Sequence, residues 1–379
     1  MSNKQTNSKK PKAGTEHKNN RYFSQYMANP EKYKRINLAI QGGGAHGAFA
    51  WGVIDRLLED GNIHFEGISG TSAGSMMAVV LAHGLLVGGR EGARESLYHF
   101  WQDIAKSGAL NNPCKQLPWE KFWFGMKMDQ SVLYHAFNSF TNWFSPYQWN
   151  VNDYNPLKEV LLANVDFALL QQCPFTKLFL SATNVRTGQV KIFKTNEITP
   201  EATLASACLP NLFKAVEIDG EYYWDGGYSG NPSLFPFFYH VESNDIVIIH
   251  VNPLERPPPP ETPAEIFNRI NEISFNSALL REFRSIDFIH NLIDKGWIKD
   301  EFKDRFKYIL LHSISADKAL NDLSVASKYS SDWDFLYLLY NRGRAKTDEW
   351  LNRHYDKIGK QSSLNLNEKL VKNHHTKTD

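Results

Sequence analysis

Residues 63–74 read IHFEGISGTSAG, and this stretch predicts a buried strand that turns abruptly into a helix. The run Ile63–Ser69 is short and mostly apolar, as expected of a strand in a parallel sheet. The motif G-x-S-x-G follows at once, and in this position it places a serine on a sharp strand-to-helix turn. Gly70 and Gly74 suit such a turn because they bring no side chain into it. Ser72, at the centre of the motif, is therefore a candidate nucleophile.

A second glycine-rich turn lies one predicted strand earlier in the chain. The apolar run Ile36–Ile40 leads into Gly42-Gly43-Gly44-Ala45-His46-Gly47, and helical periodicity follows from Ala48 to Leu58. Backbone N–H groups at such a turn stabilise negative charge. The site is either an oxyanion hole or a phosphate site, because the spacing also matches the dinucleotide motif G-x-G-x-x-G and Glu66 lies about twenty residues further on. The alternation of strands and helices predicts an α/β sheet.

A candidate base for the serine occurs much later in the chain. A serine hydroxyl is a poor nucleophile at neutral pH until a base removes its proton. Asp225-Gly226-Gly227 follows the run Glu221–Trp224, which places a carboxylate at the end of a predicted strand. An isolated Asp-Gly pair is also typical of a hairpin turn, so this motif gains weight only beside the other two.

The three motifs GGGAHG, GTSAG and DGG resemble, in kind and in order, those of the bacterial patatin-like phospholipase family. The resemblance covers residues 36–253 and implies a three-layer α/β hydrolase with a central, mostly parallel sheet. It also implies a Ser–Asp dyad, with Ser72 as nucleophile and Asp225 as base, and neither a metal nor an organic cofactor. The oxyanion hole then comes from Gly42, Gly43, Gly44 and Ala45, and the supporting glycines are Gly47, Gly70, Gly74, Gly226 and Gly227.

His46 departs from the family pattern, which usually carries Arg or Lys at this position. A neutral imidazole does not hold a lipid phosphate or a carboxylate as a fixed cation does. His46 is thus either a structural residue of the loop or a modulator of the site, and the preference for a substrate headgroup stays open.

The expected activity is that of a serine acyl-ester hydrolase acting on lipid, similar to a phospholipase A. Within the same chemistry, the alternative is a depolymerase of a hydrophobic storage polyester such as polyhydroxybutyrate. Two alternatives come from other classes: a Rossmann-type nucleotide-binding protein, and a lipid-binding protein without catalytic activity.

Residues 114–150 form an aromatic-rich insert. About a third of the segment from Leu117 to Trp149 is aromatic, well above the ordinary composition of a domain. Either the insert packs over the sheet, or it forms a lid and acyl-binding surface whose Trp and Tyr side chains suit a membrane interface. The candidate lid or acyl contacts are Trp119, Trp123 and Trp143.

Composition limits the partners of the chain. The 379 residues include 42 Lys and Arg against 41 Asp and Glu, so no overall field attracts nucleic acid. The three cysteines, without a CxxC pair, indicate neither a disulfide framework nor a zinc site. Residues 1–20 lack the apolar core of a cleavable signal, and the longest apolar run is too short to span a bilayer. We expect a cytoplasmic or peripheral membrane protein, with export as an effector left open and the oligomeric state undetermined.

The domain boundaries follow from changes in composition. We predict a disordered tail over residues 1–30, a catalytic domain over 36–253 and a proline-rich linker over 254–262. A helical region over 263–358 and a disordered tail over 359–379 complete the chain.

Overall fold

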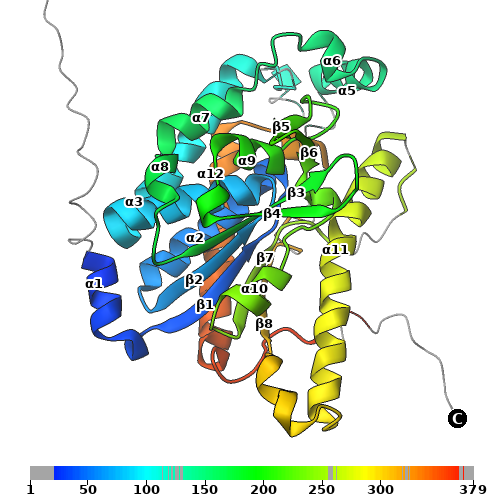
Figure 1. Cartoon of the computed structure of the whole chain (residues 1–379). Helices are drawn as coiled ribbons and strands as arrows, with labels where there is room; N and C mark the ends of the chain where they lie inside the picture. The colour runs from blue at the N-terminus through cyan, green and yellow to red at the C-terminus, as the bar shows by residue number, and fades with distance from the viewer. Residues whose placement is uncertain are drawn as a thin grey trace, which may run out of the picture.

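The computed structural model describes residues 21–112, 114–117, 119–120, 123, 128, 131–254, 259–261, 263–317, 319–320, 323, 325–366 and 370. A single sheet runs through its centre (Figure 1). Its strands are β1 (Lys34–Ile40), β2 (Ile63–Gly70), β3 (Lys177–Asn184), β4 (Val190–Lys194), β5 (Val216–Ile218), β6 (Glu221–Asp225), β7 (Asp245–His250) and β8 (Leu310–Ser315). Their order is β5-β6-β3-β2-β1-β7-β8, with β4 also paired to β3.

The middle of the sheet is parallel, and its strands end together. β1 pairs in parallel with β2 and β7, and the outer pairs β2–β3 and β7–β8 are parallel too. Ile40 lies opposite both Gly70 and Ile249, so the carboxyl ends of β1, β2 and β7 lie at one edge. β4, β5 and β6 are antiparallel to their neighbours, and β3 and β4 form a hairpin around residues 185–189. The predicted mostly parallel α/β sheet is confirmed.

Helices cover both faces of this sheet (Figure 1). One face carries α2 (Gly47–Asp60), α3 (Ala73–Asn111), α7 (Pro156–Asn164), α8 (Phe167–Leu170), α9 (Pro200–Ser206) and α12 (Trp333–His354). The other carries α10 (Phe235–His240) and α11 (Pro263–Asp294). Alternation along the strands supplies both cores: Leu38 and Ile40 face the first layer, and Ala39 faces the second. The structure therefore has the predicted three layers.

Shorter elements complete the fold. They are α1 (Arg21–Ala28), α5 (Val132–Trp143), α6 (Pro146–Trp149) and the 3-10 helices η2 (Pro30–Lys32), η3 (Gly44–His46), η5 (Thr195–Glu197), η6 (Gly226–Tyr228), η7 (Asp300–Arg305), η8 (Val325–Tyr329) and η9 (Tyr355–Lys357). α3 changes direction at Gly89, whose φ of 64° is left-handed. By length and composition α3 could cross a membrane, but 72% of its most apolar window is buried inside the protein, as in a core helix.

The structure differs from the predicted domain boundaries at three places. Residues 21–28, within the predicted N-terminal tail, form α1. The predicted helical region 263–358 contains β8, which extends the central sheet beyond β7. Residues 359–366, within the predicted C-terminal tail, lie against β7 and β8, since the Gly359 N–H donates to Asp245 at 2.8 Å. Of the predicted linker, residues 255–258 and 262 lie outside the described residues.

The C-terminal region is consequently part of the same domain as the motifs. β8 supplies a strand, and α12 packs along α2 on the first face of the sheet. Short apolar stretches such as Leu310–Ser315 do not distinguish a strand from a buried helical segment by periodicity. This ambiguity explains why the sequence predicted helices alone here.

Candidate active site

Ser72 occupies a strained turn between β2 and α3. Its φ of 57° and ψ of −127° are rarely adopted by a residue with a side chain, and such strain persists only where the surroundings enforce it. A Cβ on Gly70 would overlap the backbone of Gly74, and one on Gly74 would overlap the backbone of Ile40. The Ser72 N–H donates to the Ser206 carbonyl at 3.1 Å. These contacts produce the predicted sharp turn and lift the serine to the carboxyl edge of the sheet.

Asp225 ends β6 and is fully buried. Its Oδ1 accepts the Gly227 N–H at 2.7 Å, and its own N–H donates to the Cys208 carbonyl at 2.8 Å. Burial raises the pKa of the Asp225 carboxyl to about 7, although the Gly227 N–H and the Ser72 hydroxyl act in the opposite direction by stabilising the carboxylate. A carboxyl group with a pKa near neutrality is suited to exchanging a proton.

Ser72 and Asp225 come together from segments more than 150 residues apart in the sequence. The Ser72 hydroxyl lies near enough to lower the pKa of the Asp225 carboxyl. Among the described residues, Asp225 Oδ2 makes no hydrogen bond of ordinary geometry. Catalytic hydrogen bonds are often long in the unliganded state and shorten when substrate binds.

Gly226 and Gly227 are required by close packing around this carboxylate. A Cβ on Gly226 would overlap the backbone of Ser181 in β3. A Cβ on Gly227 would lie 2.8 Å from the ring of Phe275 in α11. The Asp-Gly-Gly sequence thus lets the end of β6 pack closely against both β3 and α11.

The glycine loop between β1 and α2 lies directly against the nucleophile turn. A Cβ on Gly42 would be 2.6 Å from the Ser72 Cβ, and Gly44 has a left-handed φ of 58°. Gly43, Gly44 and Ala45 line the same cavity as Ser72. Within the part of the chain that the structure describes, no acceptor faces the N–H groups of Gly43 and Gly44. These two donors remain suited to an oxyanion.

Gly42 differs from its predicted role as an oxyanion donor. Its N–H donates to the side-chain oxygen Oδ1 of Asn231 at 2.7 Å. Its carbonyl accepts from Asn252 Nδ2 at 2.6 Å. Both polar groups of Gly42 are therefore used to hold the loop in place, and the N–H is not directed at the cavity.

His46 and Glu66 lie in different surroundings. His46 is 2% exposed, and its Nε2 is 2.7 Å from the Ser327 hydroxyl, so the imidazole connects the loop to η8. Glu66 lies toward the opposite edge of the sheet, where its carboxylate accepts the N–H groups of Glu242 and Ser243 at 2.7 and 2.8 Å. This position removes the support that Glu66 gave to the nucleotide-binding hypothesis.

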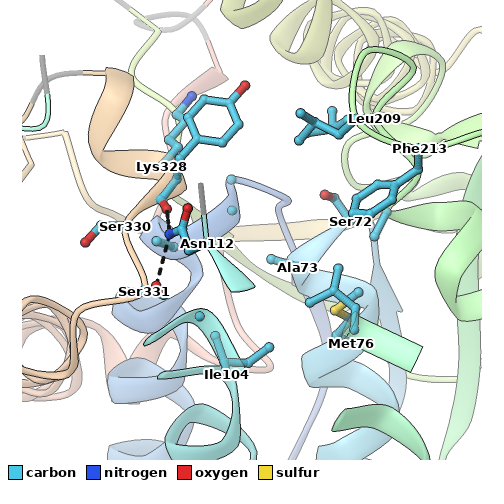
Figure 2. A pocket seen from close by; sticks show the side chains of 18 of the residues that line it. Ser72, Ala73, Met76, Ile104, Asn112, Leu209, Phe213, Lys328, Ser330 and Ser331 are labelled. Carbon is cyan, nitrogen blue, oxygen red and sulfur yellow. Dashed lines mark hydrogen bonds between the residues drawn. The ribbon is translucent and has the colours of Figure 1, made fainter. Parts of the chain in front are cut away.

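A cavity of about 350 Å³ opens over Ser72. Figure 2 shows Met76 and Ile104 below the serine, with Leu209 and Phe213 beside it and Lys328 across the cavity. Further apolar lining comes from Phe100, Trp101, Leu157, Leu212 and Phe275. The polar residues of the wall include Asn112, Asn271, Glu272, Lys328, Ser330 and Ser331.

The predicted lid residues are not part of this lining. Trp119, Trp123 and Trp143 are 50%, 73% and 84% exposed, and none of the three lines the cavity. Their predicted role as acyl contacts is not supported, because α3, α7 and the loop after α9 form the apolar wall instead. Residues 118, 121–122, 124–127 and 129–130 of the predicted insert lie outside the described residues.

Several residues of the site carry no signal in the sequence. Asn231, Asn252 and Ser206 are ordinary polar residues whose side chains hold the two turns. Lys328 enters from η8, more than 250 residues after Ser72. Only the tertiary arrangement reveals that these residues converge on the motifs.

Comparison with known proteins gives one family match. A family model described as Patatin-like phospholipase matches residues 38–238, just over half of the chain. Among solved structures, VipD from Legionella pneumophila is similar with a TM-score of 0.40 and 15% identity, over 90% of this chain and 73% of that one. ExoU from Pseudomonas aeruginosa, in complex with SpcU, is similar with a TM-score of 0.26 and 15% identity, over 66% of this chain and 51% of that one. A search of curated proteins found no match.

Proposed function

The chain belongs to the patatin-like phospholipase family, and we propose that it is a lipid acyl hydrolase with a Ser72–Asp225 dyad. The observation that supports this most directly is the position of a strained serine beside a buried carboxyl group at an apolar cavity. Among the described residues, no histidine lines the cavity, which favours a two-residue arrangement over a triad.

The proposed reaction proceeds in two acyl-transfer steps. Asp225 accepts the proton of Ser72 as the serine oxygen attacks the ester carbonyl, and the ester bond then breaks as the alcohol leaves with that proton. The N–H groups of Gly43 and Gly44 stabilise the negative charge that develops on the carbonyl oxygen. Removal of one such donor typically costs about 3 kcal/mol of transition-state stabilisation. Water, deprotonated by Asp225, then hydrolyses the acyl-serine and releases the fatty acid.

The cavity indicates the substrate class. Its volume and mostly apolar lining are typical of sites that enclose one apolar chain and orient it with a few polar groups. Met76, Leu209 and Phe213 surround the space next to Ser72 (Figure 2). We therefore propose a fatty-acyl ester, with the acyl chain against these side chains and the polar end toward Asn112, Ser330 and Ser331.

The decisive experiment is labelling with a fluorophosphonate probe followed by peptide mapping. We expect one labelled serine, Ser72, no labelling in Ser72→Ala, and strongly slowed labelling in Asp225→Asn. Labelling of another serine, or equal labelling in Ser72→Ala, would overturn the dyad. Release of fatty acid from phospholipid vesicles, compared with release of monomer from polyhydroxybutyrate granules, distinguishes the phospholipase from the polyester depolymerase.

A further inference from the structure

The glycine loop of the proposed site is held in place by residues that lie outside the range of the family match. Its backbone N–H groups must point at the substrate oxygen, yet Gly43 and Gly44 have no side chains with which to anchor themselves. Two connections fix the loop from the C-terminal side of the chain: one runs through η8 directly, and the other through Asn252.

The first connection joins η8 to η3. The Ser327 hydroxyl is 2.7 Å from His46 Nε2, and both residues are buried. The next residue, Lys328, lies with its carbonyl oxygen against Gly44, where an added Cβ would be only 2.5 Å from it. Two constraints therefore require glycine at position 44: its left-handed φ, and the backbone of η8 in the place that a Cβ would occupy.

The second connection is a chain of hydrogen bonds that begins at the Lys328 side chain. Its Nζ donates to Asn252 Oδ1 at 2.7 Å, and Asn252 Nδ2 donates to the Gly42 carbonyl at 2.6 Å. Glu272 Oε1 lies 3.7 Å from the same Nζ and neutralises part of its charge. The Lys328 side chain is 16% exposed, so these contacts form in a largely water-excluded region where hydrogen bonds are strong.

We infer that Lys328 and Ser327 are positioning residues of the oxyanion loop, and that the catalytic unit extends to η8. The inference rests on the proposed function. Lys328 acts at both ends of the loop, through Asn252 on Gly42 and through its own carbonyl on Gly44. A displacement of about 1 Å in a catalytic group can reduce the rate 100-fold, so loosening the loop reduces the chemical step more than substrate binding.

The test compares Lys328→Met with the wild type on a soluble short-chain ester and with the fluorophosphonate probe. We expect kcat to fall between about 10-fold and 100-fold with KM changed less than about twofold, and labelling of Ser72 to slow by the same factor. Because Lys328 is not among the groups that shift the pKa of Asp225, the pH midpoint of activity should stay at the wild-type value. Lys328→Arg, which keeps the charge and a donor, should recover part of the rate.

The matched control is Lys307→Met. Lys307 is also a half-buried lysine of the C-terminal region, and its Nζ donates to the carbonyls of Phe237 and Val241, far from the glycine loop. It should keep the wild-type kcat. Equal losses in the two variants, or a loss in KM alone, would show that Lys328 does not position the loop.

A second variant keeps the inference testable if Lys328→Met fails to fold. Ser327→Ala removes one oxygen atom and the hydrogen bond to His46, so kcat should fall at least about threefold while the thermal midpoint falls by only a few degrees. Wild-type kcat in folded Ser327→Ala would exclude the role of η8. Absence of labelling in the wild type would instead overturn the proposed function itself, so the two failures are distinguishable.

Discussion

Gly52 of α2 and Gly343 of α12 both lie where the two helices cross, each against the backbone of the opposite helix. A Cβ on Gly52 would overlap the carbonyl oxygen of Tyr340, and one on Gly343 would overlap that of Phe49. Each glycine thus admits the backbone of the opposite helix, and the two axes approach closely. Because α2 begins at the glycine loop, this crossing fixes the helix on which the proposed oxyanion site depends.

We predict that Gly343→Ala destabilises the protein by about 1–3 kcal/mol, because the added methyl group has no space between the helices. The sign is informative, since Gly→Ala inside an exposed helix normally stabilises by about 0.5–1 kcal/mol. Urea unfolding followed by circular dichroism measures the difference. The matched control is Gly88→Ala in α3, where an added Cβ meets nothing within 4 Å. A stability for Gly343→Ala equal to that of Gly88→Ala would contradict the close crossing.

The sequence predicts the local elements of the fold better than their long-range partners. The strand and turn around Ser72 follow from motif and apolar pattern, because the constraint on Gly70 and Gly74 is local. Neither Gly52 nor Gly343 carries such a signal, because each is required only by a helix that is distant in the sequence. For β8 the apolar pattern of Leu310–Ser315 is ambiguous, and its partner β7 lies about 60 residues earlier in the chain, so the sequence does not predict this strand.

In the candidate site, too, the sequence predicts features that depend on local motifs and does not predict those that depend on distant residues. Ser72 and Asp225 are predictable because each follows a strand in a short motif. In the structure Ser72 lines the cavity, and the fully buried Asp225 lies close to its hydroxyl. The motif predicts Gly42 as an oxyanion donor because it contains no information about Asn231, which accepts the Gly42 N–H in the structure. The predicted lid or acyl contacts Trp119, Trp123 and Trp143 do not line the cavity for a related reason: aromatic composition identifies a surface but not the cavity it faces. Their role toward lipid stays a prediction.

The raised pKa of Asp225 predicts the pH dependence of activity. The general base must be deprotonated, so kcat/KM on a soluble ester should fall as the pH decreases through about 7, the pKa of this carboxyl group. Asp225→Asn should reduce kcat/KM by about 100-fold or more and remove this dependence. A profile that is flat from about pH 5 to 8 in the wild type would contradict Asp225 as the base.

The same burial predicts that Asp225 reduces stability at alkaline pH. Its pKa is raised in the folded state from 3.8 to about 7, so the folded protein binds the proton more tightly than the unfolded chain. This stabilisation is complete below about pH 4 and is lost as the pH rises through about 7. Asparagine resembles the neutral carboxyl group and keeps an acceptor for the Gly227 N–H.

Asp225→Asn should therefore be more stable than the wild type at about pH 8, by on the order of 3 kcal/mol. At about pH 4 the two proteins should differ little, which provides an internal control. Denaturant midpoints at the two pH values measure both effects. If Asp225→Asn is inactive and also less stable than the wild type at the higher pH, then burial of the ionised Asp225 carboxylate does not lower the free energy of unfolding.

Residues 140–154 carry a surface of exposed aromatic and apolar side chains, none of which lines the cavity. Its residues are Phe140, Trp143, Phe144, Tyr147, Val151 and Tyr154. The Tyr147 hydroxyl accepts the Ala215 N–H at 3.2 Å, and Ala215 follows closely on the cavity residue Phe213. Residues 131–156 contain one acidic residue, Asp153, and neither lysine nor arginine. Exposed Trp and Tyr with few charges are typical of side chains that enter a membrane interface.

We predict that Trp143→Ser lowers hydrolysis of phospholipid vesicles at least about fivefold and leaves hydrolysis of a soluble short-chain ester unchanged, since a buried indole contributes 1–3 kcal/mol of apolar transfer free energy. Trp143 is suited to this test because it is 84% exposed and does not line the cavity. Trp297→Ser is the matched control, because Trp297 is 68% exposed and lies beyond α11. Vesicle sedimentation should show weaker binding of Trp143→Ser alone. Equal loss on both substrates would mean that Trp143 supports the fold or the cavity and not contact with lipid.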